Sequence, residues 1–131
     1  MIRVDVVTPD GHLLTDEAES LVIRNEEGML GILSNHLPIV VVIDEGFVRL
    51  RRGDEKLYVT VIGGFLEFRN NFARIIAQEA HIGRDHISAL EHLKAYRKQR
   101  LDENRQRLVD FMKMERELRE QVKEIQAGKY L

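Results

Sequence analysis

Short runs of hydrophobic residues, each closed by turn-forming residues, fill the first 83 positions of the chain. Ile2, Val4 and Val6 alternate with polar neighbours or other valines at the period of a strand with one buried face. Pro9-Asp10-Gly11 predicts a tight turn, because proline presets φ and glycine accepts a positive φ. The β-branched run at 39–43 predicts a strand buried on both faces. With further segments at 21–24, 47–51, 56–62, 65–69 and 72–78, the pattern predicts about eight to ten short strands in an antiparallel sandwich or barrel.

The pattern changes at residue 84. Eight of the nine glycines and both prolines lie at or before Gly83, and good helix formers dominate the rest of the chain. Residues 1–84 carry 9 basic and 13 acidic side chains, whereas residues 85–131 carry 11 and 9. We therefore predict an α+β chain of two parts, an antiparallel β-sandwich over 1–84 and a helical tail over 85–131.

The predicted tail separates its side chains by type when it is wound as a helix. Asp85 or Ser88 is suited to cap its start, and Gly128 to end it. At about 100° per residue, the segment 105–125 places apolar, basic and acidic side chains on three different faces. The apolar stripe is Leu108, Phe111, Leu118, Val122 and Ile125; the basic stripe is Arg105, Arg116, Arg119 and Lys123; the acidic stripe is Asp110, Glu117, Glu120 and Glu124.

The sequence leaves two tail architectures open. The polar segment 101–106 offers only weak turn chemistry. The tail therefore forms either an α-helical hairpin hinged near this segment or one extended helix of about 42 residues and roughly 60 Å.

Composition excludes several classes of protein. The net charge is −2, without the basic excess that is typical of nucleic-acid binders. There is no cysteine, so disulfides, cysteine zinc sites and thiol nucleophiles are absent, as suits a reducing compartment. No apolar run approaches the length of a membrane span, and no signal segment precedes Ile2. We expect a soluble or peripheral intracellular protein.

Candidate catalytic chemistry is sparse. The five histidines show no metal-ligand spacing, the glycine pairs are not followed by the lysine of a phosphate loop, and no carboxylate pair stands in apolar surroundings. We expect no metal, no cofactor and no catalytic residue. The predicted loop tips at Met29, Ser34, Asn35 and His36 are better candidates for contact with a partner.

Three motifs, in order and at family spacing, resemble the epsilon subunit of bacterial F-type (rotary) ATP synthase. They are Val7-Thr8-Pro9-Asp10-Gly11, Glu27-Gly28-Met29-Leu30-Gly31-Ile32-Leu33-Ser34-Asn35-His36-Leu37-Pro38 and Gly63-Gly64-Phe65-Leu66-Glu67. Read physically, Gly63-Gly64 also predicts a bend or bulge where another backbone approaches closely.

The resemblance implies a non-catalytic rotor subunit of the central stalk on the cytoplasmic face of the cell membrane. Its sandwich would bind the gamma subunit and the membrane c-ring, and its tail would extend to the alpha and beta subunits and inhibit ATP hydrolysis. The family often has an acidic residue where Met29 stands, so His36 becomes the polar candidate for the ring contact. The basic stripe becomes the candidate inhibitory contact.

The resemblance also implies a possible nucleotide site at the start of the tail. The family motif there contains an aspartate and an arginine. When this chain is aligned with the motif without a gap, it has neither residue. When the alignment is shifted by one helical turn, Glu91 stands at the position of the aspartate and Lys94 at that of the arginine. Because a lysine does not reproduce the planar fork of an arginine, we expect weak or no ATP binding.

Two other interpretations stay open at this point. One is a stand-alone β-sandwich binding module whose helical tail dimerises it, although Arg97 and Glu115 interrupt the apolar stripe. The other is a small hydrolase that uses His36, for which the sequence offers no evident acid or nucleophile partner.

Overall fold

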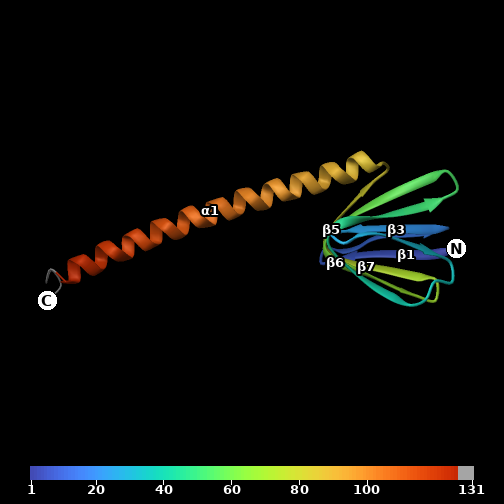
Figure 1. Ribbon diagram of the computed structural model, residues 1–131, viewed down its shortest axis with the longest axis horizontal. Coiled ribbons are helices and arrows are strands. Elements are labelled where there is room, and N and C mark those ends of the chain that lie inside the picture. Colours follow the sequence, from blue (N-terminus) through green and yellow to red (C-terminus); the bar gives the residue numbers. More distant parts are fainter. Residues whose placement is uncertain (127–131) are drawn as a thin grey trace. The chain divides into compact units, whose positions relative to one another are not determined.

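A computed structural model describes residues 1–126 of the chain. Within this range the chain forms seven strands followed by one helix (Figure 1). The elements are β1 (Ile2–Thr8), β2 (Gly11–Ala18), β3 (Ser20–Asn25), β4 (Gly28–Leu33), β5 (Ile39–Arg52), β6 (Glu55–Arg69), β7 (Phe72–Gly83) and α1 (His86–Gln126). The predicted helix stop at Gly128 lies outside the described residues.

The strands form one sheet in the order β2-β1-β7-β6-β5-β3-β4. The alternation predicted for β1 is confirmed, since Ile2, Val4 and Val6 are completely buried. The antiparallel arrangement holds for every neighbouring pair except β1 with β7, which run parallel. The parallel pair begins where the Arg3 N–H donates to the Asn71 carbonyl oxygen at 2.9 Å.

Two long strands account for the excess in the expected number of strands. The segments 39–43 and 47–51 are two halves of β5, and the segments 56–62 and 65–69 are two halves of β6. In the first half of β6 the core-facing residues Val59 and Val61 have odd numbers, whereas in the second half Leu66 and Phe68 have even numbers. The strand therefore turns over between its halves. One sheet therefore folds back on itself into a sandwich, and both halves of each long strand line one core.

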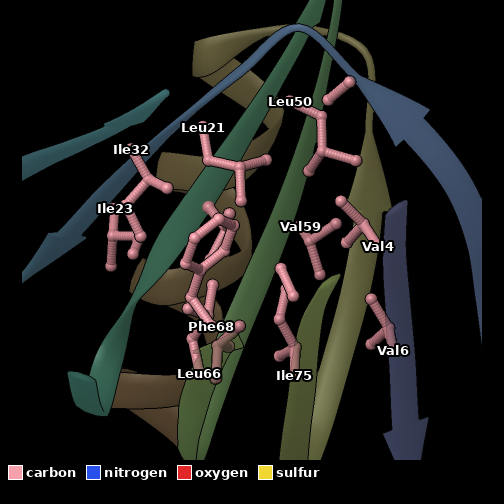
Figure 2. Close-up of a cluster of buried hydrophobic side chains, with 14 of the residues drawn as sticks. Val4, Val6, Leu21, Ile23, Ile32, Leu50, Val59, Leu66, Phe68 and Ile75 are labelled. Atoms are coloured by element: carbon pink, nitrogen blue, oxygen red, sulfur yellow. The ribbon is translucent and has the colours of Figure 1, made fainter. Parts of the chain in front are cut away.

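Figure 2 shows that core between the two layers. Labelled side chains from β1, β3, β4, β5, β6 and β7 point toward one another, with the Phe68 ring among them. These side chains are fully or almost fully buried, and burial of one such side chain contributes about 1.5–3 kcal/mol. The core thus lies wholly within the segment that the sequence predicted as a sandwich.

The sheet turns over along a line through Asp44, Gly63 and Gln78, which we call the fold line. These residues lie side by side, between the registered pairs Ile43–Gly64 and Glu45–Ile62 on one side and Ile62–Glu79 and Gly64–Ala77 on the other. Gly63 has a φ of 61°, which bends the backbone. At Gly64 a Cβ would meet the Ile76 carbonyl oxygen and the Ala77 Cα of β7. The bend and close backbone approach predicted for this glycine pair are confirmed.

One expectation about burial is wrong. The run 39–43 is not buried on both faces, because Val40 is 63% exposed and Val42 59% exposed. Ile43 is fully buried, so only one side of the run faces the core. The continuous apolar pattern does not distinguish the side chains that face the core from those that are exposed on the outer face of the sheet.

The tail is the extended helix of the two predicted architectures: α1 runs without a break for 41 residues. Asp85 caps it, because its Oδ1 accepts a hydrogen bond from the Ser88 N–H at 2.7 Å. This hydrogen bond stabilises the carboxylate and lowers the pKa of Asp85. No helix within residues 1–126 has the length and apolar character needed to cross a bilayer.

The first turns of α1 belong with the sandwich. Ala89 and Leu93 are buried, and Ala89 forms a small cluster with Phe47 and Tyr58 on the outer side of the sheet. The chain accordingly divides into two compact units, the first of which ends at Lys94. This unit is ten residues longer than the predicted sandwich of 1–84.

Candidate partner-binding surfaces

The loop after β4 is held by a reciprocal pair of asparagines. Asn35 has a φ of 66°, and its N–H donates to the Asn71 Oδ1 at 2.6 Å. The Asn71 Nδ2 donates in return to the Asn35 Oδ1 at 3.0 Å. Asn71 lies in the turn between β6 and β7, where Asn70 also has a positive φ. Two loops that are far apart in the sequence therefore form one rigid surface.

His36 is fixed on this surface by two contacts. Its Nδ1 lies 2.7 Å from the Leu37 carbonyl oxygen, and its ring meets the Phe68 ring edge-on at a centroid distance of 6.0 Å. Neither contact is the carboxylate that a catalytic histidine requires, so the geometry lends no support to the hydrolase interpretation. His36 presents the rest of its ring as a positioned polar group.

The structure does not bring all four predicted contact residues together. Ser34, Asn35 and His36 follow the end of β4, whereas Met29 lies near its beginning. At about 3.3 Å per strand residue, Met29 and Ser34 are roughly 17 Å apart. Met29 instead lines a groove of about 560 Å³ between β4 and the first half of β5.

That groove carries an acidic rim that the sequence analysis missed. Glu26, Glu27 and Asp44 line it together with the exposed Met29. Glu26 is tied down, because its Oε1 accepts a hydrogen bond from the Glu45 N–H at 2.6 Å. The signal in the sequence is the pair of glutamates at the turn between β3 and β4.

An exposed apolar strip crosses the outer side of the other layer. Val42 pairs with Phe65, which pairs with Ile76, so the three side chains are direct neighbours on β5, β6 and β7. Val40 extends the strip along β5, and all four side chains count among the exposed large hydrophobic residues. We call these four residues the apolar strip.

The tail presents the stripes that its sequence predicted. The five side chains of its apolar stripe are between 51% and 64% exposed. The four residues of its basic stripe are exposed as well and fall within about 60° of arc on the helix. Arg119 is already paired, since its Nη2 lies 2.6 Å from the Glu115 Oε1 one helical turn away.

The candidate nucleotide contacts lie near the start of α1. Glu91 and Lys94 are three residues apart on the helix, and both are exposed. This spacing lets the two side chains reach the same neighbouring surface.

Comparisons with known proteins decide the family. Residues 1–83 match the beta-sandwich domain of the ATP synthase delta/epsilon chain. The epsilon chain of Alkalihalophilus pseudofirmus is 38% identical over 111 residues, which cover 84% of each chain. The epsilon chain of Macrococcus caseolyticus is 33% identical over 98% of this chain and 97% of its own. The chain belongs to the ATP synthase epsilon family.

The match to the Macrococcus epsilon chain includes the tail, so the family resemblance is not confined to the sandwich. Among solved structures, a chain of the Euglena gracilis mitochondrial ATP synthase has a TM-score of 0.56 over 74% of this chain and 64% of its own, at 24% identity. That similarity supports the fold. As an epsilon-family chain, the protein is a subunit of ATP synthase rather than its catalytic one.

Proposed function

We propose that this epsilon-family chain is a rotor subunit of the central stalk, which couples the catalytic head to the membrane c-ring and inhibits ATP hydrolysis through its tail. The observation that carries the proposal is the apolar strip, a contiguous hydrophobic surface on an otherwise complete sandwich. Solved central-stalk and c-ring assemblies of ATP synthase contain chains of similar fold. The subunit would sit peripherally on the cytoplasmic face of the cell membrane.

The apolar strip is the proposed site for the gamma subunit. Exposed hydrophobic patches on a stable domain mark surfaces that bind a partner. A standard interface buries about 800 Å² on each side, which the outer face of one layer of the sandwich can supply. Val42 and Phe65 lie at the centre of the strip, where a few side chains contribute most of the binding energy.

The c-ring is the proposed partner of the loop ends. Where the family often carries an acid, this chain has Met29, but Glu26, Glu27 and Asp44 stand around it in the same groove. The acidic charge is therefore displaced to neighbouring positions rather than lost. At the opposite end of β4, Asn35 and His36 supply a rigid polar surface.

The basic stripe is the proposed inhibitory contact with the alpha and beta subunits. A single exposed ion pair contributes only about 0–1 kcal/mol, so the four residues must act together. Arg119 would exchange its pairing with Glu115 for an acidic partner, which reduces its net contribution. A shift of the tail from mostly bound to mostly free takes about 5 kcal/mol of differential binding, which four partly desolvated pairs approach.

The gamma contact is tested by capture of purified gamma on immobilised full-length chain. Val42→Asp or Phe65→Asp should weaken capture by at least about tenfold, since each removes a central apolar contact. Leu13→Asp is the matched control, because Leu13 is exposed on β2, outside the strip. Equal capture by all three variants would refute the assignment of the strip.

The inhibitory contact is tested on the reconstituted catalytic head. We expect full-length chain to inhibit ATP hydrolysis and a chain ending at Lys94 to relieve that inhibition. Alanine at all four basic positions should relieve it to the same degree. If the truncated chain activates and the quadruple variant remains as inhibitory as the wild type, the basic stripe is not the contact. A dimer in sedimentation experiments would instead favour the tail as a dimerisation element.

A further inference from the structure

Two arginine side chains lie over one aromatic ring on the outer face of the layer that carries the apolar strip. The Cζ atoms of Arg3 on β1 and Arg74 on β7 are 5.6 Å and 5.4 Å from the centroid of the Phe72 ring. Both arginines are exposed, and the ring is partly buried. A cation over an aromatic face is attracted by the quadrupole of the ring, so Phe72 positions both guanidinium groups. A hollow of about 310 Å³ beside the ring is lined by Glu67, Arg69, Asn70, Phe72 and Arg74.

This group of side chains is close to the apolar strip. Phe72, Arg74 and Ile76 occupy successive outward-facing positions of β7, and Ile76 belongs to the strip. At about 3.3 Å per residue, Phe72 lies roughly 13 Å along the strand from Ile76. An interface of the standard 800 Å² per partner has a radius of about 16 Å. A partner seated on the strip would therefore also cover Arg74 and Phe72.

The two arginines keep their hydrogen-bond donors free. Within residues 1–126, neither guanidinium group makes a hydrogen bond or an ion pair. The neighbouring carboxylates in the strand register are Glu17, opposite Arg3, and Asp5 and Glu67, both opposite Arg74. The Asp5 Oδ1 instead accepts a hydrogen bond from the Thr15 hydroxyl at 2.8 Å. Since a guanidinium group carries its donors around the edge of its plane, stacking on the ring leaves them available to a planar anion such as a carboxylate.

We propose that Arg3 and Arg74, stacked on Phe72, bind an acidic side chain of the gamma subunit beside the apolar strip. The inference rests on the proposed gamma contact and adds a charged group to it. The hollow beside the ring has room for one such side chain. Arg69, which flanks Phe72 on β6 in the strand register, adds a third positive charge there. Arginine and aromatic side chains next to an apolar centre contribute strongly to affinity, and their charge selects a partner of opposite sign.

The test measures association and dissociation of purified gamma on immobilised full-length chain. Arg3→Gln combined with Arg74→Gln should weaken binding at least about tenfold, chiefly through faster dissociation, because a direct contact is lost. At about 0.5 M NaCl the difference should shrink to about threefold or less, since salt screens the wild-type contact. Arg24→Gln combined with Arg52→Gln is the matched control, because it removes the same charge from exposed positions outside the strip.

Two variants at Phe72 test its role as a positioning residue. Phe72→Leu keeps an apolar side chain but removes the ring, and it should speed dissociation by about threefold or more. Phe72→Tyr retains the ring and should bind gamma as the wild type does. Equal binding by these two variants would overturn the positioning role. If Phe72→Leu does not fold, the arginine variants decide the question, because both arginines are exposed.

The result for Val42→Asp separates this inference from the proposed function. If Val42→Asp weakens gamma capture and the double arginine variant binds like its matched control, the gamma contact stands and the arginine contact is refuted. If neither variant changes capture, both are refuted. A further arm replaces gamma with phosphatidylglycerol vesicles. Vesicle binding that the double arginine variant loses, with gamma capture unchanged, would assign the arginines to a lipid headgroup and overturn the proposal.

Discussion

Alanine at Gly64 should destabilise the sandwich far more than alanine at the adjacent Gly63. At Gly64 the new Cβ would overlap the Ile76 carbonyl oxygen and lie 2.7 Å from the Ala77 Cα, both of which are backbone atoms of β7. Relief requires β7 to move by about an ångström, which overpacks the core and weakens several ladder hydrogen bonds. At about 1–3 kcal/mol for overpacking and 0.5–1.5 kcal/mol for each bond, the cost is about 3 kcal/mol or more.

At Gly63 the cost has a different origin. Its φ of 61° places alanine in the left-handed region, which costs about 1–2 kcal/mol. The nearest atom to the new Cβ is the Gln78 Oε1 at 2.9 Å, the end of a flexible exposed side chain that can swing away. Gly31 is the matched control: its φ is not positive, and nothing lies within 4 Å of the position of its Cβ. Alanine at Gly31 should therefore be close to neutral.

Urea denaturation followed by circular dichroism measures these differences. With a slope of about 2 kcal/mol/M, the midpoint should fall by about 0.5–1 M for Gly63→Ala and by about 1.5 M or more for Gly64→Ala. For Gly31→Ala it should stay within about 0.3 M of the wild type. A midpoint for Gly64→Ala at or above that of Gly63→Ala would refute the role given to close backbone approach at the fold line.

Three further outcomes are expected. The Asp85 cap contributes fully above about pH 4 and is lost as the pH falls through the lowered pKa of Asp85, so the Ser88 amide shift should titrate in that acidic range and Asp85→Asn should abolish the titration. Asn35→Ala should lower the free energy of unfolding by about 1–3 kcal/mol in thermal denaturation, because it removes the Oδ1 that accepts from the Asn71 Nδ2 and places alanine at a φ of 66°. Calorimetry should show ATP binding weaker than micromolar, and exchange of the two candidate nucleotide contacts for aspartate and arginine should tighten it roughly ten- to a hundredfold.

The sequence predicted what is local in this fold. The alternation of β1, the turn at Pro9-Asp10-Gly11 and the cap at Asp85 each depend on a few adjacent residues, and all three are present. The joining of 39–43 with 47–51 into one strand depends on tertiary contact. Gly46, which separates the two predicted segments, lies within β5, where a Cβ would collide with the Arg24 carbonyl oxygen of β3.

The candidate surfaces were predictable to a smaller extent for the same reason. The loop residues Ser34, Asn35 and His36 follow from turn chemistry, and they do form one turn after β4. Asn71 could not be found this way, because its partner Asn35 lies 36 positions earlier in the chain. The acidic rim around Met29 likewise gathers residues from two separate segments on either side of a groove.

The error at 39–43 and the apolar stripe of the tail have one physical explanation. Hydrophobic residues are selected at every position that is buried in the complete assembly. The folded monomer, however, buries only the side chains that face its own core. Val40 and Val42 are 63% and 59% exposed, and Leu108, Phe111 and Leu118 are similarly exposed on α1. Each such side chain retains a large part of the 1.5–3 kcal/mol that full burial contributes. This hydrophobic energy, which folding of the monomer does not use, is available for association.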